Sequence, residues 1–390
     1  MAPPTAPQQE ARPRAAIVGT GMIGEVHRRA VRAAGGELAG VLGSTPARSR
    51  AVGRAWGTHA YADLDELLAD GAVDVVHLCT PNHTHAGFAG RALAAGRHVV
   101  CEKPLGVSGA EAEALTRAAR DSGLVATVPF VYRYHPLVRE LRRRRQAGEF
   151  GDWNLLHGSY LQDWMLSPEA SGWRVDPQRG GPSRAFADIG SHWCDLVEWV
   201  SGERFTELTA ASSVVTPERP AGDGPKTPVR TEDCAALLLR TARGVLGSLT
   251  VSQVSAGRKN RLWFELDGAA GSAVFDQERP ETVWLGGGTA ADGDRVLHRG
   301  EAAPGTEHAR LSALPPGHPQ GYADCFAAFV ADTYAAIAGV AGAAGTPGAT
   351  GLAGELPEGL PTFADGLRAA RLADAFLSSS RTGNWTKVTA

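Results

Sequence analysis

The stretch Ala15-Ala16-Ile17-Val18-Gly19-Thr20-Gly21-Met22-Ile23-Gly24 decides the fold of this chain. A short apolar run stands directly before a Gly-x-Gly-x-x-Gly turn, and a helix is expected to follow. Gly19 permits a tight turn, Gly21 removes a Cβ that would strike a pyrophosphate, and Gly24 lets the helix lie against the strand. The helix start offers unpaired N–H groups and a partial positive charge to phosphates. The predicted dinucleotide contacts here are Gly19, Gly21, Met22, Ile23 and Gly24.

Length and composition are those of an ordinary globular protein. The chain has 390 residues, 43% of them hydrophobic, which is enough for two domains with their own cores. A net charge of −3 gives no electrostatic reason to expect nucleic acid or a membrane surface as a partner, and Arg142 to Arg145 are interpreted as a solvated helix face. No uninterrupted apolar run approaches about 18 residues, so no transmembrane helix is expected.

The N-terminus and the cysteines predict the compartment. The first fourteen residues are rich in Pro, Ala and Gln and lack an apolar segment, which predicts a disordered N-terminus over 1–14 and no signal peptide. Five cysteines at wide, irregular spacing indicate buried thiols in a reducing cytoplasm, not disulfides or a zinc site. His77, His83 and His85 have no fixed set of carboxylates or thiolates beside them, so no metal ion is expected.

Apolar runs and turn signals alternate as strand and helix through about residue 128. This alternation predicts a Rossmann-type parallel sheet with helices on both faces, in a dinucleotide-binding domain over 15–133. Asp63 is expected to cap a helix through Leu68, and Ser108 with Glu111 predicts a capping box for a helix to Ser122. The expected strands are Ala15 to Val18, Glu37 to Leu42, Val73 to Cys79, Arg97 to Cys101 and Leu124 to Val128.

After Pro129 the pattern changes, and the fold class predicted for the whole chain is α/β with a second α+β domain. A basic helix near Leu137 to Ala147 precedes alternating and β-branched runs, which predict an open, mostly antiparallel sheet over 134–362 with helices on one face. Segments 218–230 and 339–361 are rich in Gly, Ala and Pro and are predicted to be long loops. Residues 363–390 are expected to form a helix through Leu377 and a tail that pack back on the body. The expected strands are Asn154 to Tyr160, Cys234 to Leu239, Val245 to Val254 and Leu262 to Leu266.

Two short segments follow predicted strands of the parallel sheet. Ligands of such sheets lie beyond the carboxyl ends of the strands. Thr80-Pro81-Asn82, with His85 close behind, and Glu102-Lys103 are therefore expected to face the dinucleotide, with Lys103 beside its nicotinamide. The alternative for Lys103 is an ion pair with Glu102 on an exposed loop.

A second constellation runs from Asp188 to Asp195. If it is helical, Asp188, His192 and Asp195 share one face, opposite a buried stripe of Ile189, Trp193, Leu196, Val197 and Val200. A carboxylate four residues before an imidazole can fix its tautomer and favour its protonated form, which suits a group that accepts a proton at neutral pH. The alternative is that Asp188 only caps the helix and His192 is solvated. Oxidation of an alcohol needs a base beside the nicotinamide, and this need favours the first interpretation.

These segments together resemble the Gfo/Idh/MocA oxidoreductases, named for glucose–fructose oxidoreductase and inositol dehydrogenase. The resemblance implies a Rossmann domain and an open, mostly antiparallel sheet that often mediates oligomers, so a homodimer or homotetramer is expected. It also implies Lys103 and His192 as the catalytic pair, Asp188 as the residue that orients His192, and Asp195, Tyr132 and Arg133 as substrate contacts. The motifs that carry it are Gly19 to Gly24, Thr80-Pro81-Asn82-His83, Glu102-Lys103-Pro104, Tyr132-Arg133-Tyr134-x-Pro136, Asp188 to Asp195 and Phe363-Ala364-Asp365-Gly366.

Within the family, the segments Tyr160 to Trp164 and Trp173-Arg174 resemble members that act on sugars, of the levoglucosan dehydrogenase type. Trp164 and Trp173 can stack on the apolar face of a pyranose or cyclitol. Asp163 and Arg174 can then hydrogen-bond its hydroxyl groups. The alternative for each tryptophan is ordinary core or loop packing.

The sequence leaves the cofactor open between NAD and NADP. Sites selective for NAD usually carry an acidic residue about 20 positions after the glycines, where it bonds the ribose 2′-hydroxyl. Here the strand ends in Val41-Leu42-Gly43-Ser44-Thr45 without a carboxylate. A 2′-phosphate is then not repelled, and Ser44, Thr45 or Arg48 could bind it.

The predicted activity is hydride transfer between NAD or NADP and a secondary hydroxyl or ketone of a sugar, sugar derivative or cyclitol. Two other functions remain open. A glycoside hydrolase that uses bound NAD transiently would cleave its substrate without net reduction of the nicotinamide. A nucleotide-sensing regulator would bind NAD(P)H without turnover, but it has no need of the acid–base set formed by Lys103, Asp188 and His192.

Overall fold

The computed structural model describes residues 12–220, 224–289, 293–301, 303–343 and 356–389. Its first sheet is parallel throughout and has the strand order β3-β2-β1-β4-β5-β6. These strands are β1 (Arg14–Val18), β2 (Glu37–Leu42), β3 (His59–Ala60), β4 (Val75–Leu78), β5 (His98–Cys101) and β6 (Ala126–Thr127). The helices between them are α1 (Met22–Ala33), α2 (Pro46–Trp56), α3 (Leu64–Ala69), α4 (His85–Ala94) and α5 (Gly109–Ser122). The five predicted strands are therefore present, most of them shorter than expected, and β3 is an addition.

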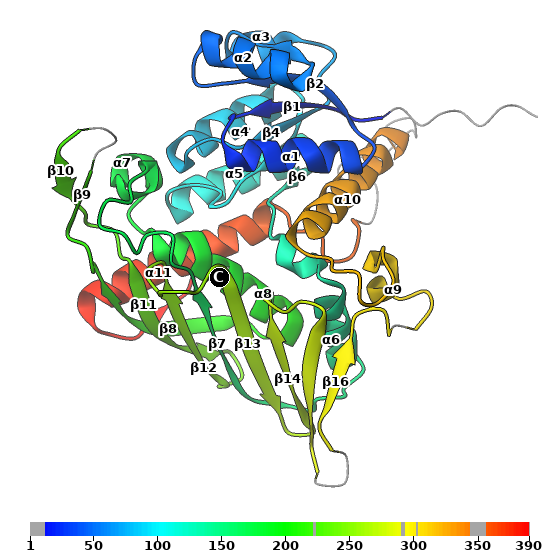
Figure 1. Ribbon diagram of the computed structural model, residues 1–390, viewed down its shortest axis with the longest axis vertical. Coiled ribbons are helices and arrows are strands. Elements are labelled where there is room, and N and C mark those ends of the chain that lie inside the picture. The colour runs from blue at the N-terminus through cyan, green and yellow to red at the C-terminus, as the bar shows by residue number, and fades with distance from the viewer. Residues whose placement is uncertain (1–11, 221–223, 290–292, 302, 344–355, 390) are drawn as a thin grey trace, which may run out of the picture.

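A second sheet of nine strands has the order β16-β15-β14-β13-β7-β12-β11-β8-β17. Its strands are β7 (Trp153–Leu161), β8 (Phe205–Ser213), β11 (Cys234–Thr241), β12 (Leu246–Ser252), β13 (Arg261–Gly268), β14 (Gly271–Asp276), β15 (Thr282–Gly287), β16 (Arg295–His298) and β17 (Thr386–Lys387). Neighbours are antiparallel except β12 and β7, which run parallel. Figure 1 shows the parallel sheet in blue and cyan at the top and the larger sheet in green and yellow below it. The predicted fold class is confirmed.

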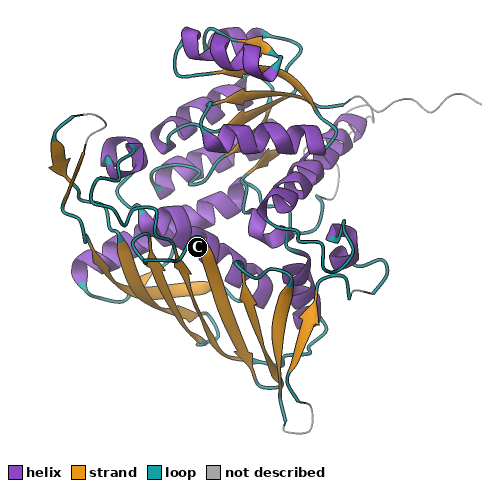
Figure 2. Ribbon diagram, viewed as in Figure 1, coloured by secondary structure: helices purple, strands orange, loops and turns teal. Residues whose placement is uncertain are grey.

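Helices pack between and behind the sheets, as Figure 2 shows in purple. They are α6 (Pro136–Gln146), α7 (Pro177–Gly180), α8 (Ser191–Ser201), α9 (Glu307–Leu311), α10 (Tyr322–Ala343) and α11 (Phe363–Thr382). Short turns of other helical types are η1 (Asn82–Thr84), η2 (Val131–Tyr134) and η3 (Trp173–Val175), and η4 (Phe186–Gly190) is π-helical. Helix α8 lies close against β7, because a Cβ at Gly158 would come within 2.5 Å of Trp193 Nε1. Helix α11 packs on both α5 and β8 and so ties the two sheets together.

The predicted helix signals are largely present. Asp63 caps α3 by accepting a hydrogen bond from the Glu66 N–H, and Ser108 caps α5 in the same way through the Glu111 N–H. The expected capping box is incomplete, because the Glu111 carboxylate accepts the Val107 N–H and not the Ser108 N–H. The buried stripe predicted for α8 is present, since its five apolar members are all 2% exposed or less.

Three other expectations were wrong in part. Arg14, placed in the disordered N-terminus, starts β1 and pairs with Asp74, while residues 1–11 lie outside the described residues. The 218–230 loop contains the hairpin of β9 (Glu218–Pro220) and β10 (Lys226–Pro228), which the buried Arg219 anchors to Asp233. The start of the 339–361 loop continues α10 to Ala343, and residues 344–355 are outside the described part.

Helix α10 is apolar for a structural reason. Between Tyr322 and Val340 it is long and apolar enough to cross a membrane by length and composition, but half of this segment is buried in the protein. Phe326, Phe329 and Val330 belong to a core cluster shared with Ala30 and Val31 of α1. The apolar residues of α10 therefore serve the core of the protein. The five cysteines are free thiols.

The glycine turn gives the first testable prediction. Gly19 has φ of +107°, and a Cβ there would lie 2.4 Å from the Cys79 carbonyl oxygen, whereas a Cβ at Gly21 would meet no atom within 4 Å. We expect Gly19→Ala to lower the free energy of unfolding by about 1–3 kcal/mol or more, because strain and overlap act together. Gly21→Ala is the matched control, which should leave the free energy of unfolding unchanged and weaken the binding of the predicted dinucleotide. Equal stability of the two variants in denaturant unfolding would contradict this account of the turn.

Candidate functional site

The glycine turn is shaped to receive a phosphate group. Gly24 lets α1 approach the strand, since a Cβ there would be 2.3 Å from the Gly19 carbonyl oxygen. Helix α1 begins at Met22 without any side-chain cap, so the first N–H groups, including that of Ile23, are not used by a side chain of the described chain. Open space at Gly21 and a helix N-terminus free of a side-chain cap fit a dinucleotide pyrophosphate.

The tip of β2 lies beside this turn. Thr45 caps α2 by accepting the Arg48 N–H, so its hydroxyl oxygen already has a donor. The Arg48 guanidinium donates to the Thr20 hydroxyl at 3.0 Å and to the Thr20 carbonyl at 3.1 Å. Ser44 is exposed. Arg48 therefore stands next to the turn with part of its guanidinium still available.

The segment after β4 lies against α7. The Asn82 side chain donates to the Gly180 carbonyl at 2.8 Å and is thus already engaged by protein. The buried His85 ring lies between the carbonyl oxygens of Thr80 and Pro104, at 2.9 and 2.8 Å, and connects this segment to the one after β5. The Asn82 and His85 side chains therefore support the loop that begins with Thr80 and Pro81.

Lys103 and Asp188 meet at the centre of the site. Lys103 Nζ donates to Asp188 Oδ1 at 2.6 Å and to the Asp188 backbone carbonyl at 3.1 Å. Asp188 Oδ2 accepts from Gln253 Nε2 at 2.8 Å. Burial acts to raise the pKa of Asp188, but the charges of Lys103 and Arg174 and the Lys103 hydrogen bond hold it well below its usual range. The alternative pairing of Lys103 with Glu102 is wrong, because each has a different partner.

His192 is close to this ion pair but does not bond to it. The residue is 8% exposed, and its ring centre lies 5.1 Å from that of Tyr132 and 5.5 Å from that of Phe130. Nδ1 has no hydrogen-bond partner among the described residues. Burial and then the Lys103 charge lower the pKa of His192 to about 3, against the opposing influence of Asp188 and Glu102. The histidine is therefore neutral at physiological pH and can accept a proton.

The π-helical turn explains why Asp188 does not orient His192 as expected. Asp188 lies in η4, where hydrogen bonds join residues five apart, and α8 starts only at Ser191. A wider turn rotates the carboxylate away from the imidazole four residues on. Asp188 points to Lys103, and neither the expected hydrogen bond to His192 nor the alternative N-terminal cap is formed. The expectation that Asp188 keeps His192 protonated was wrong.

A hydrogen-bonded network beside His192 escaped the sequence analysis. The Tyr132 and Tyr160 hydroxyls are 2.6 Å apart, and Asn260 donates to the first and accepts from the second. Tyr160 belongs to a segment that the sequence had singled out, but Asn260, in the bend before β13, carries no motif, so no signal in the sequence joins the two. Gln253 was also missed, although its position at the end of a predicted strand is of the kind that marked Lys103.

Trp164, Trp173 and Arg174 gather at the rim. The Arg174 guanidinium lies 4.4 Å from the centre of the Trp173 ring and 5.9 Å from that of Trp164. Arg174 Nε is 3.9 Å from Asp188 Oδ1, which connects the rim to the ion pair. Trp164 is 40% exposed, so its ring face is partly open to a ligand. Asp163 is bound to Lys259 Nζ at 2.6 Å and to the Gly257 N–H.

Arg133 and Asp195 are paired with each other. Arg133 Nε donates to Asp195 Oδ2 at 2.8 Å, a second bond closes the fork, and Arg133 also donates to Asp365 at 2.7 Å. The Arg133 and Asp195 side chains are 6% and 7% exposed. The structure thus gives both side chains protein partners and places them under the site.

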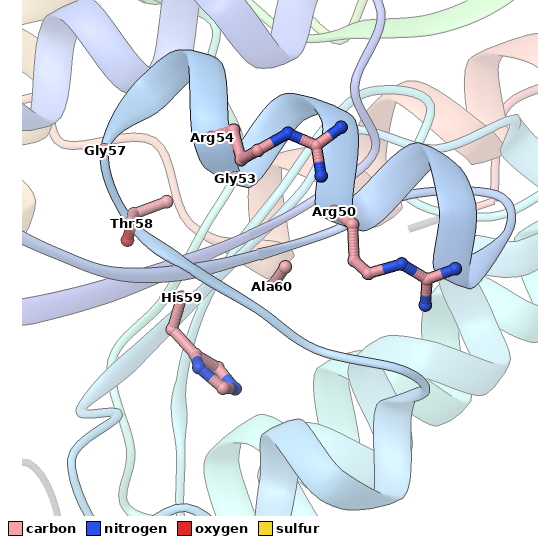
Figure 3. Close-up of a pocket in the computed structure, with 7 residues that line it drawn as sticks. All are labelled: Arg50, Gly53, Arg54, Gly57, Thr58, His59 and Ala60. Carbon is pink, nitrogen blue, oxygen red and sulfur yellow. The ribbon is translucent and has the colours of Figure 1, made fainter.

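Two other features lie away from these residues. Figure 3 shows a pocket on α2 and β3 lined by Arg50, Arg54 and His59, and it contains none of the predicted site residues. In the described part of the chain, His157, Glu265 and Asp267 have ligand atoms within 4.8 Å of one another. They stand on the face of the larger sheet opposite α8. The contacts of Lys103 with Asp188 define the site.

Comparison with known proteins matches both halves of the chain to domains of one family. Residues 13–130 match an oxidoreductase family with an NAD-binding Rossmann fold, and residues 138–274 match the GFO/IDH/MocA C-terminal domain. Levoglucosan dehydrogenase of Pseudarthrobacter phenanthrenivorans is 32% identical over 85% of this chain and 84% of its own length. Inositol 2-dehydrogenase of Rhizobium meliloti is 27% identical over 70% of this chain and 79% of its own.

Solved structures are similar over nearly the full length. A levoglucosan dehydrogenase in complex with NADH and L-sorbose has a TM-score of 0.86 at 30% identity, covering 97% of this chain and 99% of that one. An inositol dehydrogenase homologue from Azotobacter vinelandii in complex with NAD+ has a TM-score of 0.85 at 27% identity, covering 97% of this chain and 98% of its own.

The environment of His192 leads to a prediction about its titration. Its folded pKa of about 3 lies below the unfolded value near 6.5, so the unfolded chain gains a proton first as the pH falls. His192 should therefore destabilise the fold below about pH 6.5 and stay neutral between pH 5 and 8. NMR of histidine-labelled protein, with the His192 signal assigned by its loss in His192→Ala, measures this. A midpoint between pH 6 and 7 would refute a neutral, buried base.

Proposed function

Because the chain belongs to the Gfo/Idh/MocA family of NAD-binding oxidoreductases, we propose that Lys103 and His192 catalyse hydride transfer between nicotinamide and a secondary alcohol. Two matched family domains, and a relative 32% identical over 85% of the chain, carry the family assignment. The chain is an NAD-dependent dehydrogenase that acts on the hydroxyl group of a sugar or cyclitol, as its relatives do.

The observation that carries the proposed mechanism is the Lys103–Asp188 contact of 2.6 Å beside a neutral His192. An ammonium group has three donors, and two of them are used on Asp188, so one remains for the oxygen of the substrate. A nicotinamide dinucleotide, held at the glycine turn, would supply the acceptor or donor of the hydride. A ring nitrogen of His192 takes the hydroxyl proton, while Lys103 stabilises the negative charge that develops on the oxygen. Asp188 positions Lys103, and Gln253 positions Asp188.

The rim residues support a sugar or cyclitol substrate. Trp164 and Trp173 offer ring faces near Arg174, a combination suited to the C–H face and the hydroxyl groups of a pyranose. Asp163 is held by Lys259, so we assign it a supporting role beside the substrate. Tyr132 lies beside His192 and contacts the substrate in this proposal, while Arg133 and Asp195 hold η2 and α8 together from below.

The cofactor of this chain is a nicotinamide dinucleotide held by Gly19, Gly21, Gly24 and the N–H groups of Met22 and Ile23. Similar structures contain NADH or NAD+, which favours NAD. The absence of a carboxylate at the tip of β2 and the position of Arg48 beside Thr20 would also allow a 2′-phosphate. We therefore propose NAD as the cofactor, with tolerance of NADP through Ser44 and Arg48.

The first functional prediction concerns His192 and Lys103. We expect His192→Ala to lower kcat by about 10²–10⁴-fold, the usual contribution of a general base, with little change in NADH affinity. Lys103→Met should be comparably damaging, because it removes the donor to the reacting oxygen. The assay follows nicotinamide absorbance with NAD and with NADP against a panel of sugars and cyclitols, levoglucosan and inositol included.

His157→Ala, a half-buried histidine on the opposite face of the larger sheet, is the matched control and should keep full activity. Unchanged turnover in both site variants would refute the assignment of the catalytic pair. Cleavage of a glycoside without net reduced nicotinamide would instead indicate the hydrolase, and NADH binding without any turnover would indicate a sensor.

We also propose a cytoplasmic homo-oligomer, a dimer or tetramer, formed through the larger sheet. The face of this sheet opposite α8 carries partly exposed apolar side chains, and Figure 1 shows no described helix in front of it. A stretch of large apolar residues of this kind is typical of a protein interface. These residues are Leu155, Leu161, Leu238, Leu246, Trp263, Val274 and Trp284. Neither a membrane nor nucleic acid is proposed as a partner, and the free cysteines agree with a reducing compartment.

The oligomer makes a prediction about mass in solution. Light scattering after size exclusion should give twice or four times the mass of the chain, and Trp284→Glu should reduce it, because a buried charge at an interface is costly. Leu314→Glu changes another exposed apolar residue outside this face and should leave the mass as it is. A monomeric parent protein would end the proposal of an oligomer and leave that of the activity intact.

A further inference from the structure

A chain of buried polar groups leads away from the site, and the proposed mechanism makes no use of it. His27 on α1 and His77 on β4 are both fully buried, and Tyr334 on α10 is 4% exposed. His27 Nε2 is 3.2 Å from Glu102 Oε1, His27 Nδ1 is 2.9 Å from His77 Nδ1, and His77 Nε2 is 3.1 Å from the Tyr334 hydroxyl. We call His27, His77 and Tyr334 the relay.

The relay runs along the strand direction of the parallel sheet, from the carboxyl ends of the strands to their amino ends. Glu102 directly follows β5, at the carboxyl edge where Lys103 stands, and its Oε2 accepts the Lys103 N–H at 3.1 Å. Tyr334 is at the opposite edge, since a Cβ at Gly36, just before β2, would touch its ring at 2.5 Å. The buried groups therefore extend well beyond the reach of a substrate.

While Glu102 is ionised and the buried His77 is neutral, the hydrogen bonds of the relay can be completed in only two ways, because each imidazole nitrogen either donates or accepts. With both histidines neutral, Tyr334 donates to His77, His77 Nδ1–H donates to His27, and His27 Nε2–H donates to Glu102. With His27 protonated, it donates to both Glu102 and His77, and His77 Nε2–H donates to the Tyr334 oxygen. The Tyr334 hydroxyl fits both arrangements, because it can either donate or accept a hydrogen bond. In both arrangements the donor to Glu102 is the same His27 Nε2–H.

We propose that His27, His77 and Tyr334 are positioning residues that keep Glu102 ionised beneath Lys103, whatever the protonation state of the relay. This inference deepens the proposed function and rests on the dehydrogenase activity of the site. The negative charge of Glu102 then offsets part of the effect that the positive charge of Lys103 has on His192. Loss of the relay would leave the buried carboxylate with the Lys103 backbone N–H but without its side-chain donor, and such a group takes up a proton more readily.

The surroundings of Glu102 support this assignment. Burial acts to raise the pKa of Glu102, but the hydrogen bond and charge of His27 and the charge of Lys103 lower it overall. Burial also holds the pKa of His77 well below its usual range, so His77 is neutral in both arrangements. The other titratable groups that face the relay and Glu102 are Cys79, Cys101, His85, Tyr322 and Asp74. None of these groups donates a hydrogen bond to the Glu102 carboxylate in the described part of the chain, and Lys103 reaches the carboxylate through its backbone N–H.

The test compares three substitutions of the relay. His27→Phe keeps a ring against Phe326 but removes the donor to Glu102. His27→Gln restores an N–H donor of similar reach, and Tyr334→Phe removes only the far hydroxyl. His98→Gln is the matched control, because His98 is a histidine of the neighbouring strand β5 whose Nδ1 accepts the Val125 N–H outside the relay. The measurements are the pH dependence of kcat/KM, the pH dependence of NADH binding, and thermal melting as a check of folding.

We expect the acid limb of both pH profiles to move up by about one pH unit or more in His27→Phe, since the lost hydrogen bond favoured the charged carboxylate. His27→Gln and His98→Gln should keep the limb of the parent protein, and Tyr334→Phe should move it by less than His27→Phe. An unmoved limb in folded His27→Phe, or an equal shift in His27→Gln, would overturn the proposal.

If His27→Phe does not fold, the pH profile of Tyr334→Phe and the tautomer of His27 in the parent protein test the proposal. NMR of the parent protein should show a proton on His27 Nε2 throughout the active pH range. A bare His27 Nε2, or a folded Tyr334→Phe with an unmoved limb, would overturn the relay. Failure of the parent protein to turn over any sugar would reject the proposed function, while the NADH-binding profile would still test the relay.

Discussion

The contact between Lys103 and Asp188 is the interaction on which the site depends. Lys103 follows a strand of the parallel sheet, and Asp188 lies in the π-helical turn that leads into the helix behind the second sheet. A single ion pair of 2.6 Å therefore joins the part of the chain that binds the dinucleotide to the part that carries His192. With its side chains 15% and 18% exposed, the pair keeps a strong electrostatic influence on its neighbours.

Burial and charge act together around this pair. The Lys103 ammonium adds to the effect of burial on His192, so the imidazole is kept neutral, and in the described chain its Nδ1 makes no hydrogen bond to a carboxylate that would favour its protonated form. Glu102 is ionised on the other side of Lys103 because His27 donates to it. The proposed relay extends this balance through the sheet to α10, whose apolar residues build the core that keeps His27 and His77 away from water. The fold and the chemistry of the site thus depend on the same packing.

Local patterns predicted the elements well where a local cause forms them. The glycine turn, the caps by Asp63 and Ser108 and the stripe of α8 each depend on residues a few positions apart, and each is present. The β9–β10 hairpin was missed because Arg219 holds it through Asp233, a contact that no local pattern encodes. The capping box is incomplete because the Glu111 carboxylate accepts the Val107 N–H and not the Ser108 N–H.

The sequence by itself determined the parallel sheet, the glycine turn and the presence of Lys103 and His192 at the ends of elements, because strand order and helix starts follow from periodicity and local hydrogen bonding. Only the tertiary structure decided the partners of these residues. The π-helical turn points the Asp188 carboxylate at Lys103 and not at His192. Arg133 and Asp195 pair with each other. Tyr160, Asn260, Gln253 and the relay came together from segments far apart in the chain. Side-chain pairing of this kind depends on packing between segments far apart in the chain, which no local spacing records.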